Sequence, residues 1–102
     1  MVTDKDYLNY VSELLSLAEV SFRPMMGEYV LYCKGKVIGG CYDDRFLMKS
    51  TPSARELLPN AEYAVPYKGA KEMLVVDGED KLFLKELCER VADDLPPPGK
   101  KR

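Results

Sequence analysis

The stretch "RPMMGEYVLYCKGKVIGGCYDDRFLMK", residues 23–49, decides the fold. It contains two runs of β-branched and aromatic residues, 29–33 and 37–42, which are typical of strands. Between the runs stands Lys34 followed by Gly35, a plausible two-residue turn in which glycine supplies the positive φ. The stretch therefore predicts a β-hairpin.

The second half of this stretch extends the hairpin into a small sheet. Asp43 and Asp44 form a further turn, and the run 46–49, Phe-Leu-Met-Lys, predicts a third antiparallel strand. Adjacent Gly39 and Gly40 would weaken the strand in which they lie. They indicate a bulge, or another backbone or side chain that packs closely against them.

The segments before the hairpin predict a helix and an edge strand. Residues 22–26 suggest a short strand in which Pro24 cannot donate to a ladder, so that an edge or a bend is expected before the turn at Gly27. Thr3, followed three residues later by Asp6, is a weaker relative of the capping box. An amphipathic helix is predicted from apolar residues at three- and four-residue steps, namely Tyr7, Leu8, Val11, Leu14, Leu15 and Ala18.

The second half of the chain predicts a short helix and a second hairpin. Thr51 supplies a capping oxygen and Pro52 a favoured first helical residue, so that a helix is expected from there to Leu58. Residues 62–67 and 72–76 then predict two strands joined by a glycine-containing turn. The first of these strands also contains a proline, which again indicates an edge.

A last helix completes the predicted domain. It is expected to begin at Glu79, with Asp77 as its cap, and to end at the prolines of 96–98. The order of helix, three strands, short helix, two strands and helix describes an α+β domain with an antiparallel sheet and packed helices. We expect one domain over residues 1–95 and an exposed, proline-rich basic tail over 96–102, because 102 residues with 46% apolar content suffice for one core.

Charge and cysteine content restrict the environment. Fifteen lysines and arginines stand against 17 acidic residues, so that the net charge of -2 gives no general attraction to polyanions. No apolar run approaches the roughly 18 to 20 residues that cross a bilayer, and no leader peptide is apparent. Cys33, Cys41 and Cys88 form no CxxC pair and are interpreted as reduced core residues. We expect a cytoplasmic protein without a membrane partner.

The residues needed for catalysis are poorly represented. The chain has no histidine, which is the commonest proton shuttle and metal ligand. In the predicted register Cys33 and Cys41 lie roughly 16 Å apart, too far to share a zinc ion or a disulfide. The aspartate pairs 43–44 and 93–94 are interpreted as solvated or capping residues. We therefore expect no enzyme, no catalytic residues, no cofactor and no metal.

The opening stretch resembles the signature of the TfoX/Sxy N-terminal domain family. That signature runs roughly Arg-x-Met-Phe-Gly-Gly-Tyr, a strand, Asp-Gly-Lys, a second strand and Tyr-Leu-Lys. The resemblance covers about residues 4–95, with Met26 in place of the usual phenylalanine and Glu28 in place of the second glycine. The matching positions are Arg23, Met25, Gly27, Tyr29, Gly35, Lys36 and Lys49.

The resemblance implies both a fold and a role. The implied fold is akin to the α/β sandwiches of type III secretion chaperones. The implied role lies in the regulation of natural competence in bacteria, through non-enzymatic contact with other regulatory macromolecules. The longer competence regulators carry a second, helical domain, whereas this sequence ends at Arg102, so that a stand-alone N-terminal domain is expected.

We therefore predict a protein-interaction or regulatory module. Its candidate surface consists of Arg23, Met25, Met26 and Glu28, which combine a fork of hydrogen-bond donors with adaptable thioethers. The expected partner is an unidentified protein, with a second copy of the chain as one candidate. The competing interpretation is that both methionines fill the core and that Arg23 pairs internally with Glu28.

The alternative function is that of a nucleic-acid-associated domain. It would use lysines at the hairpin ends and the basic tail as phosphate contacts, and its affinity would fall steeply with salt. Lysines at turns more often keep sheet edges soluble. The candidate phosphate contacts are Lys34, Lys36, Lys100, Lys101 and Arg102.

Overall fold

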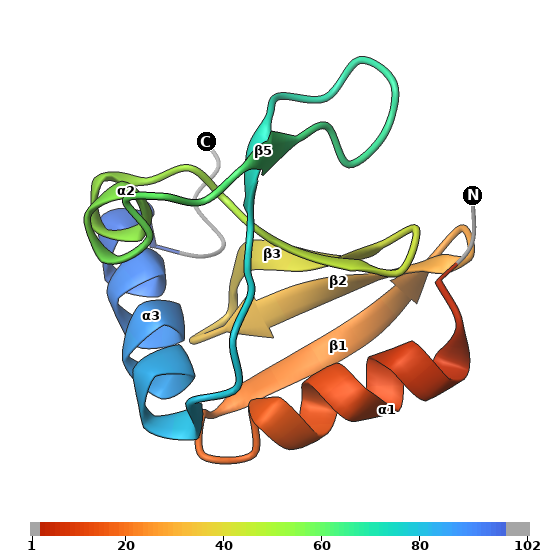
Figure 1. The fold of residues 1–102 in the computed structure, drawn as a ribbon, viewed down its shortest axis with the longest axis horizontal. Helices are drawn as coiled ribbons and strands as arrows, with labels where there is room; N and C mark the ends of the chain where they lie inside the picture. Colours follow the sequence, from red (N-terminus) through yellow and green to blue (C-terminus); the bar gives the residue numbers. More distant parts are fainter. Residues whose placement is uncertain (1–2, 98–102) are drawn as a thin grey trace.

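A computed structural model describes residues 3–97, which form a six-stranded antiparallel sheet with three helices (Figure 1). The helices are α1 (Lys5–Leu14), α2 (Pro52–Leu57) and α3 (Lys81–Asp94). The strands are β1 (Val20–Met25), β2 (Glu28–Cys33), β3 (Lys36–Tyr42), β4 (Arg45–Met48), β5 (Tyr63–Ala64) and β6 (Met73–Val75). None of the helices within 3–97 has both the length and the apolar character needed to cross a membrane.

The predicted α+β class and the order of helices and strands are confirmed. Across the sheet the order is β1-β2-β3-β4-β6-β5, so that β1 and β5 are the edges, as the prolines beside them indicated. The short strand predicted over 22–26 is part of the longer β1, which ends at Met25, so that four strands precede α2. The second hairpin is shorter than predicted, because β5 ends at Ala64, two residues before Pro66, and residues 65–72 form a long loop.

Two-residue turns join the first four strands. They are Met26-Gly27, Lys34-Gly35 and Asp43-Asp44, and each lies between a directly paired residue on either side. All six turn residues have positive φ, between 52° and 86°. Positive φ at both positions defines the type I′ turn, whose twist matches that of the flanking strands. The predicted turn at Lys34-Gly35 is thus confirmed, and the same geometry recurs on both sides of it.

A bulge interrupts the pairing of β2 with β3. Leu31 pairs with Gly39 and Tyr32 pairs with Val37, so that Ile38 is the surplus residue. Such a bulge places two residues of one strand opposite one residue of its neighbour. The irregularity that the glycine pair predicted therefore lies directly beside it, and the surplus side chain is fully buried.

The two glycines of β3 are required by close contacts. A Cβ on Gly39 would lie 2.2 Å from the carbonyl oxygen of Leu47 in β4. A Cβ on Gly40 would lie 2.4 Å from the carbonyl oxygen of Tyr29 and 2.8 Å from the ring of Tyr42. Both halves of the prediction, the bulge and the close approach, are thus found in this strand.

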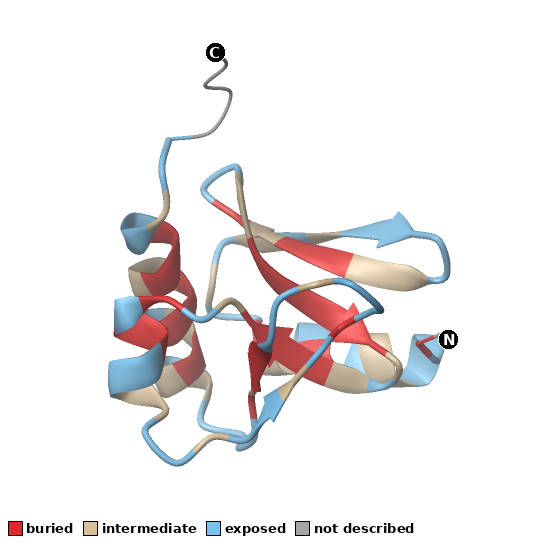
Figure 2. Cartoon of the chain, turned by 90° about the horizontal axis from the view of Figure 1, so that it is seen from above, coloured by how far each residue is buried: buried red, intermediate tan, exposed pale blue. Residues whose placement is uncertain are grey.

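The sheet has a separate apolar cluster on each face. The pairing of Gly40 with Leu47, and of Leu47 with Val75, places these positions on the face away from the helices. Figure 2 shows that burial is concentrated in the inner strands and along one side of α3, whereas β1 is mostly exposed. The outer cluster contains Tyr42, Leu47 and Met73. The larger, helix-covered core includes Val11, Leu15, Leu31, Cys41, Phe46, Met48, Leu84, Leu87 and Val91.

The predicted cap of α1 is wrong. Asp4 caps this helix and its carboxylate accepts a hydrogen bond from the N–H of Asp6, at 3.3 Å. Thr3 is unsuited to capping because its hydroxyl donates to Glu28 Oε1, at 2.7 Å. The cap of α2 is Thr51, as predicted.

The predicted start of α3 is also wrong. Asp80 caps this helix by accepting from the N–H groups of Leu82 and Phe83, at 3.1 and 3.2 Å. Asp77 instead accepts from the N–H of its neighbour Gly78, at 2.9 Å. The sequence has an aspartate at both positions, and the carboxylate of Asp77 is used in a local turn rather than in a helix cap.

Candidate functional site

The predicted interaction surface lies on the edge strand β1 and the turn after it. Arg23 is exposed, and its guanidinium carbon lies 5.1 Å from the centroid of the Tyr32 ring, within the range of a cation–π contact. Met25 is 40% exposed and Met26 is 94% exposed. The interpretation in which both methionines fill the core is therefore wrong.

Met26 occupies a position that does not suit its side chain. It is the first central residue of a type I′ turn, with φ of 52°, where asparagine, aspartate or glycine is favoured. A bulky residue in the left-handed region carries a conformational penalty. Full exposure means that no packing within the described part of the chain offsets this penalty.

Glu28 has an internal role. Its Oε1 accepts hydrogen bonds from the hydroxyl of Thr3, at 2.7 Å, and from the backbone N–H of Asp43, at 3.0 Å. It thus connects the N-terminal segment, β2 and the turn between β3 and β4. Glu28 does not pair with Arg23, contrary to the competing interpretation, and the accessible part of the predicted surface consists of Arg23, Met25 and Met26.

An open depression adjoins Arg23 on the outer face of the sheet. Its volume is about 680 Å³, and its walls come from the start of β1 and from the β2–β3 turn. The cation–π pair forms part of the rim, so that the guanidinium group of Arg23 stands beside a concave surface. The lining residues are Glu19, Val20, Ser21, Arg23, Tyr32, Lys34 and Gly35.

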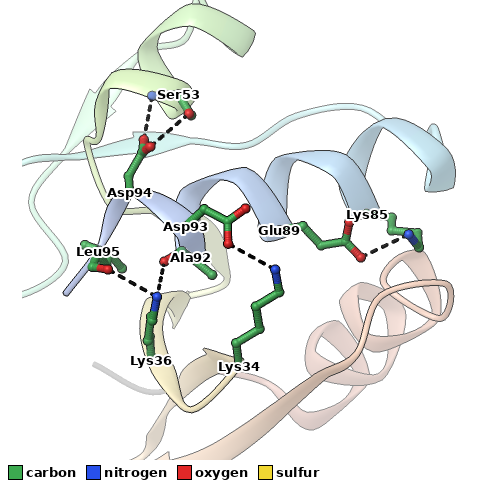
Figure 3. A network of polar contacts seen from close by, with 9 residues as sticks. All are labelled: Lys34, Lys36, Ser53, Lys85, Glu89, Ala92, Asp93, Asp94 and Leu95. Carbon is green, nitrogen blue, oxygen red and sulfur yellow. Dashed lines mark hydrogen bonds and ion pairs between the residues drawn. The ribbon is translucent and has the colours of Figure 1, made fainter. Parts of the chain in front are cut away.

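The candidate phosphate contacts of the β2–β3 turn are already bound to α3 (Figure 3). Lys34 Nζ forms an ion pair with Asp93, at 3.0 Å. Lys36 Nζ donates to the carbonyl oxygens of Ala92 and Leu95, at 2.8 and 3.1 Å, at the C-terminal end of the helix. The remaining candidates, Lys100, Lys101 and Arg102, lie outside the described residues.

A second cavity lies beneath the loop 65–72, on the face of the sheet away from the helices. Figure 1 shows this loop projecting beyond β5. The cavity has a volume of about 500 Å³, within the range of small-molecule sites. It is lined by Val37, Tyr42, Lys49, Ser50, Thr51, Pro66, Tyr67, Ala70, Lys71, Glu72, Met73 and Leu95.

Two polar side chains of this cavity have no ion-pair or hydrogen-bond partner among residues 3–97. Burial lowers the pKa of the half-buried Lys49, and the ion pairs formed within residues 3–97 do not include it. Burial also raises the pKa of Tyr42, which is 5% exposed and whose hydroxyl has no hydrogen-bond partner in the described range. The ring of Tyr42 packs against that of Tyr67, with centroids 6.1 Å apart.

Sequence reasoning did not predict this cavity. Lys49 directly follows the buried run 46–48, and a charge at the end of such a run is the signal that could have indicated it. The partner residues come from a loop some 20 positions later, whose path no local pattern predicts. Among residues 3–97 no group of three metal-binding side chains is present.

Comparison with known proteins identifies the family. A family model described as the TfoX N-terminal domain matches residues 12–84. An uncharacterised 12.7 kDa protein in the trpE 5′ region of Spirochaeta aurantia is 37% identical over 101 residues, which cover 96% of this chain and 88% of the relative. The match includes β1 to β4 and the turns that join them. The chain therefore belongs to the TfoX N-terminal domain family.

Proposed function

We propose that this protein is a non-enzymatic regulatory module that binds a partner protein in the cytoplasm. The partner contacts Arg23, Met25 and Met26. The observation that carries the proposal is the side chain of Met26, which is 94% exposed at a turn position that disfavours it. Local rules are most often broken at functional sites, and an interface is where an exposed thioether is useful.

The contact is made by side chains of β1 and its turn. Pro24 has no N–H, so that a partner strand added along this edge would lack one ladder hydrogen bond. Arg23, by contrast, stands beside the 680 Å³ depression and can present its fork of donors to a carboxylate of the partner. Arginine and methionine are both enriched at the centres of interfaces.

Membership of the TfoX N-terminal domain family supports the regulatory part of the proposal. The resemblance noted above implies competence regulation by contact with other macromolecules. Three buried, unpaired cysteines are in keeping with a reducing compartment, and thus with the cytoplasm.

The test is affinity capture of the tagged full chain from its native lysate, with and without nuclease, read by mass spectrometry. Arg23→Ala and Met25→Asp are compared with two matched controls, Arg55→Ala on α2 and Leu82→Asp on α3, which alter exposed residues elsewhere. Far-UV circular dichroism verifies that each variant is folded. We expect the partner to resist nuclease, to be lost with the two β1 variants and to be kept with both controls.

Two outcomes would contradict the proposal. Equal retention by the β1 variants and the controls would exclude this surface. Loss of all specific recovery on nuclease treatment would instead favour the nucleic-acid function, with a basic site that includes Lys34 or the tail. Sedimentation velocity of the purified chain shows whether the captured partner is a second copy.

A further inference from the structure

The cavity beneath the loop 65–72 combines unpaired polar groups with apolar walls. Lys49 presents an ammonium group that no carboxylate of the described chain neutralises. An unpaired charge loses hydration when it is half-buried, and a bound anion would restore a favourable environment. The wall also contains Lys71 and Glu72, so that the lining carries one net positive charge and matches a single negative one.

The second observation is the hydroxyl of Tyr42. The residue as a whole is 5% exposed, but its hydroxyl oxygen remains accessible, because the one fully buried side-chain atom without a partner in residues 3–97 is Arg45 Nε. Residues 3–97 supply no hydrogen-bond partner for this hydroxyl, and Tyr42 lines the cavity, so that the hydroxyl is free to donate to a group bound there. The absence of a side chain at Gly40 leaves space for the ring of Tyr42 to pack against the sheet, which positions the tyrosine beside the cavity.

The rest of the wall is suited to an apolar body. Val37, Met73 and the ring of Tyr67 lie in the same lining. We propose that this cavity binds a small organic acid, whose carboxylate accepts hydrogen bonds from Lys49 and Tyr42 and whose aromatic or aliphatic body packs on these apolar side chains. Small-molecule sites commonly have this composition, a mainly apolar wall with a few polar groups.

This inference goes beyond the proposed function and stands independently of it. The interaction surface lies on β1 and its turn, whereas the cavity lies across β3, from Val37 to Tyr42, and beside the end of β4, under the loop before β6. Loss of the protein partner in the Arg23→Ala variant would leave the cavity intact. Failure of ligand binding would likewise leave the interaction surface untouched.

The experiment is a titration of the full ¹⁵N-labelled chain followed by amide chemical shifts. The probes are benzoate, its neutral isostere benzamide, and inorganic phosphate. We expect saturable shifts with benzoate at residues 49–51 and 70–73, and affinity for benzamide at least about tenfold weaker, because charge-assisted hydrogen bonds are lost. Phosphate, which lacks an apolar body, should bind weakly or not at all.

Three variants locate the binding groups. Lys49→Met should reduce benzoate affinity to that of benzamide, and Tyr42→Phe should weaken it several-fold. Lys68→Met removes a lysine of the same loop that does not line the cavity, and it should have no effect. The dispersion of the amide spectrum shows whether each variant is folded.

The proposal fails on any of three results with the wild-type chain alone, so that it does not depend on the stability of a variant. These are the absence of saturable benzoate shifts, equal affinity for benzoate and benzamide, and shifts that lie away from the cavity. Equal binding of phosphate and benzoate would also overturn it, because the apolar wall would then make no contribution.

Discussion

Asp94, the last residue of α3, accepts two hydrogen bonds from Ser53 in the first turn of α2. The backbone N–H of Ser53 lies 2.8 Å from Asp94 Oδ2, and the Ser53 hydroxyl lies 3.1 Å from Oδ1. A carboxylate at the start of a helix satisfies free N–H groups and complements the helix dipole. This contact joins two helices that are 24 residues apart in the chain at their nearest ends.

Replacement of Asp94 should destabilise the fold in a pH-dependent way. The hydrogen bond from the Ser53 backbone holds the pKa of Asp94 below its usual value. Because the folded pKa is depressed, the stabilisation is present above the unfolded pKa and is lost as the pH falls through the folded one. Asp94→Asn should lower the free energy of unfolding by about 1 kcal/mol at neutral pH. This is the contribution of a charge-assisted hydrogen bond, reduced because Asp94 is exposed to solvent.

Urea unfolding of both proteins at neutral pH and at successively lower pH measures this effect. The difference between wild type and variant should shrink below about pH 4, where carboxylates become protonated. Asp93→Asn is the matched control, since that neighbour forms only an exposed ion pair with Lys34, and it should have a smaller effect. A loss of equal size in the two variants would contradict the role assigned to Asp94.

Alanine at Gly39 should strongly destabilise the sheet. The added Cβ would meet the backbone of Leu47, which cannot move without separating β3 from β4. We expect a loss of about 3 kcal/mol, the upper part of the range for overpacking. Gly78→Ala is the control, since no atom lies within 4 Å of its Cβ and only the positive φ opposes it; a loss of about 1 kcal/mol is expected there. Similar losses in both variants, measured by thermal unfolding, would argue against close packing.

Asparagine at position 26 should separate stability from partner binding. Asparagine tolerates the left-handed conformation of the type I′ turn, so that Met26→Asn should raise the free energy of unfolding by about 0.5 kcal/mol. The same variant should retain less of the captured partner. Met25 lies in the extended strand and not in the turn, so that Met25→Asn relieves no conformational penalty and should not raise the free energy of unfolding. A stabilised Met26→Asn protein with full retention would exclude Met26 from the interface.

The cysteines should be unreactive until the protein unfolds. Burial raises the pKa of Cys41 and of Cys88 to about 12, and it raises the pKa of Cys33 as well. Because the thiolate is the nucleophile, a thiol reagent at mildly alkaline pH should react with all three only in denaturant. Rapid labelling of one cysteine in the native protein, followed with Ellman's reagent, would show that its surroundings open readily.

Much of the sheet could be predicted from local patterns. The runs that became β2 and β3 have the residues typical of strands, and Lys34-Gly35 between them has the composition of a tight turn. The cap of α2 was equally local, because threonine and then proline form a recognised helix start. The cysteines were correctly interpreted as core residues.

The errors arose where residues distant in sequence compete for one group. Thr3 looked like a cap, but Glu28 of β2 binds its hydroxyl. Met26 looked equally suited to a core, and only the turn geometry shows that it faces solvent. The cavity around Lys49 escaped prediction for the same reason, since its roof belongs to a loop with no periodicity of its own.

The surplus residue at Ile38 determines which side chains each face of the sheet receives. Side chains alternate along a strand, so that one additional residue exchanges the two faces for everything that follows. With the bulge, Cys41 enters the helix-covered core, and Tyr42 lies on the other face, where it lines the same cavity as Lys49. If the same residues paired without the bulge, Gly39 to Tyr42 would each change face, so that the tyrosine would turn toward the helices and the cavity would lack its hydroxyl. The proposed capacity of this small domain to bind a ligand thus depends on one surplus residue in β3.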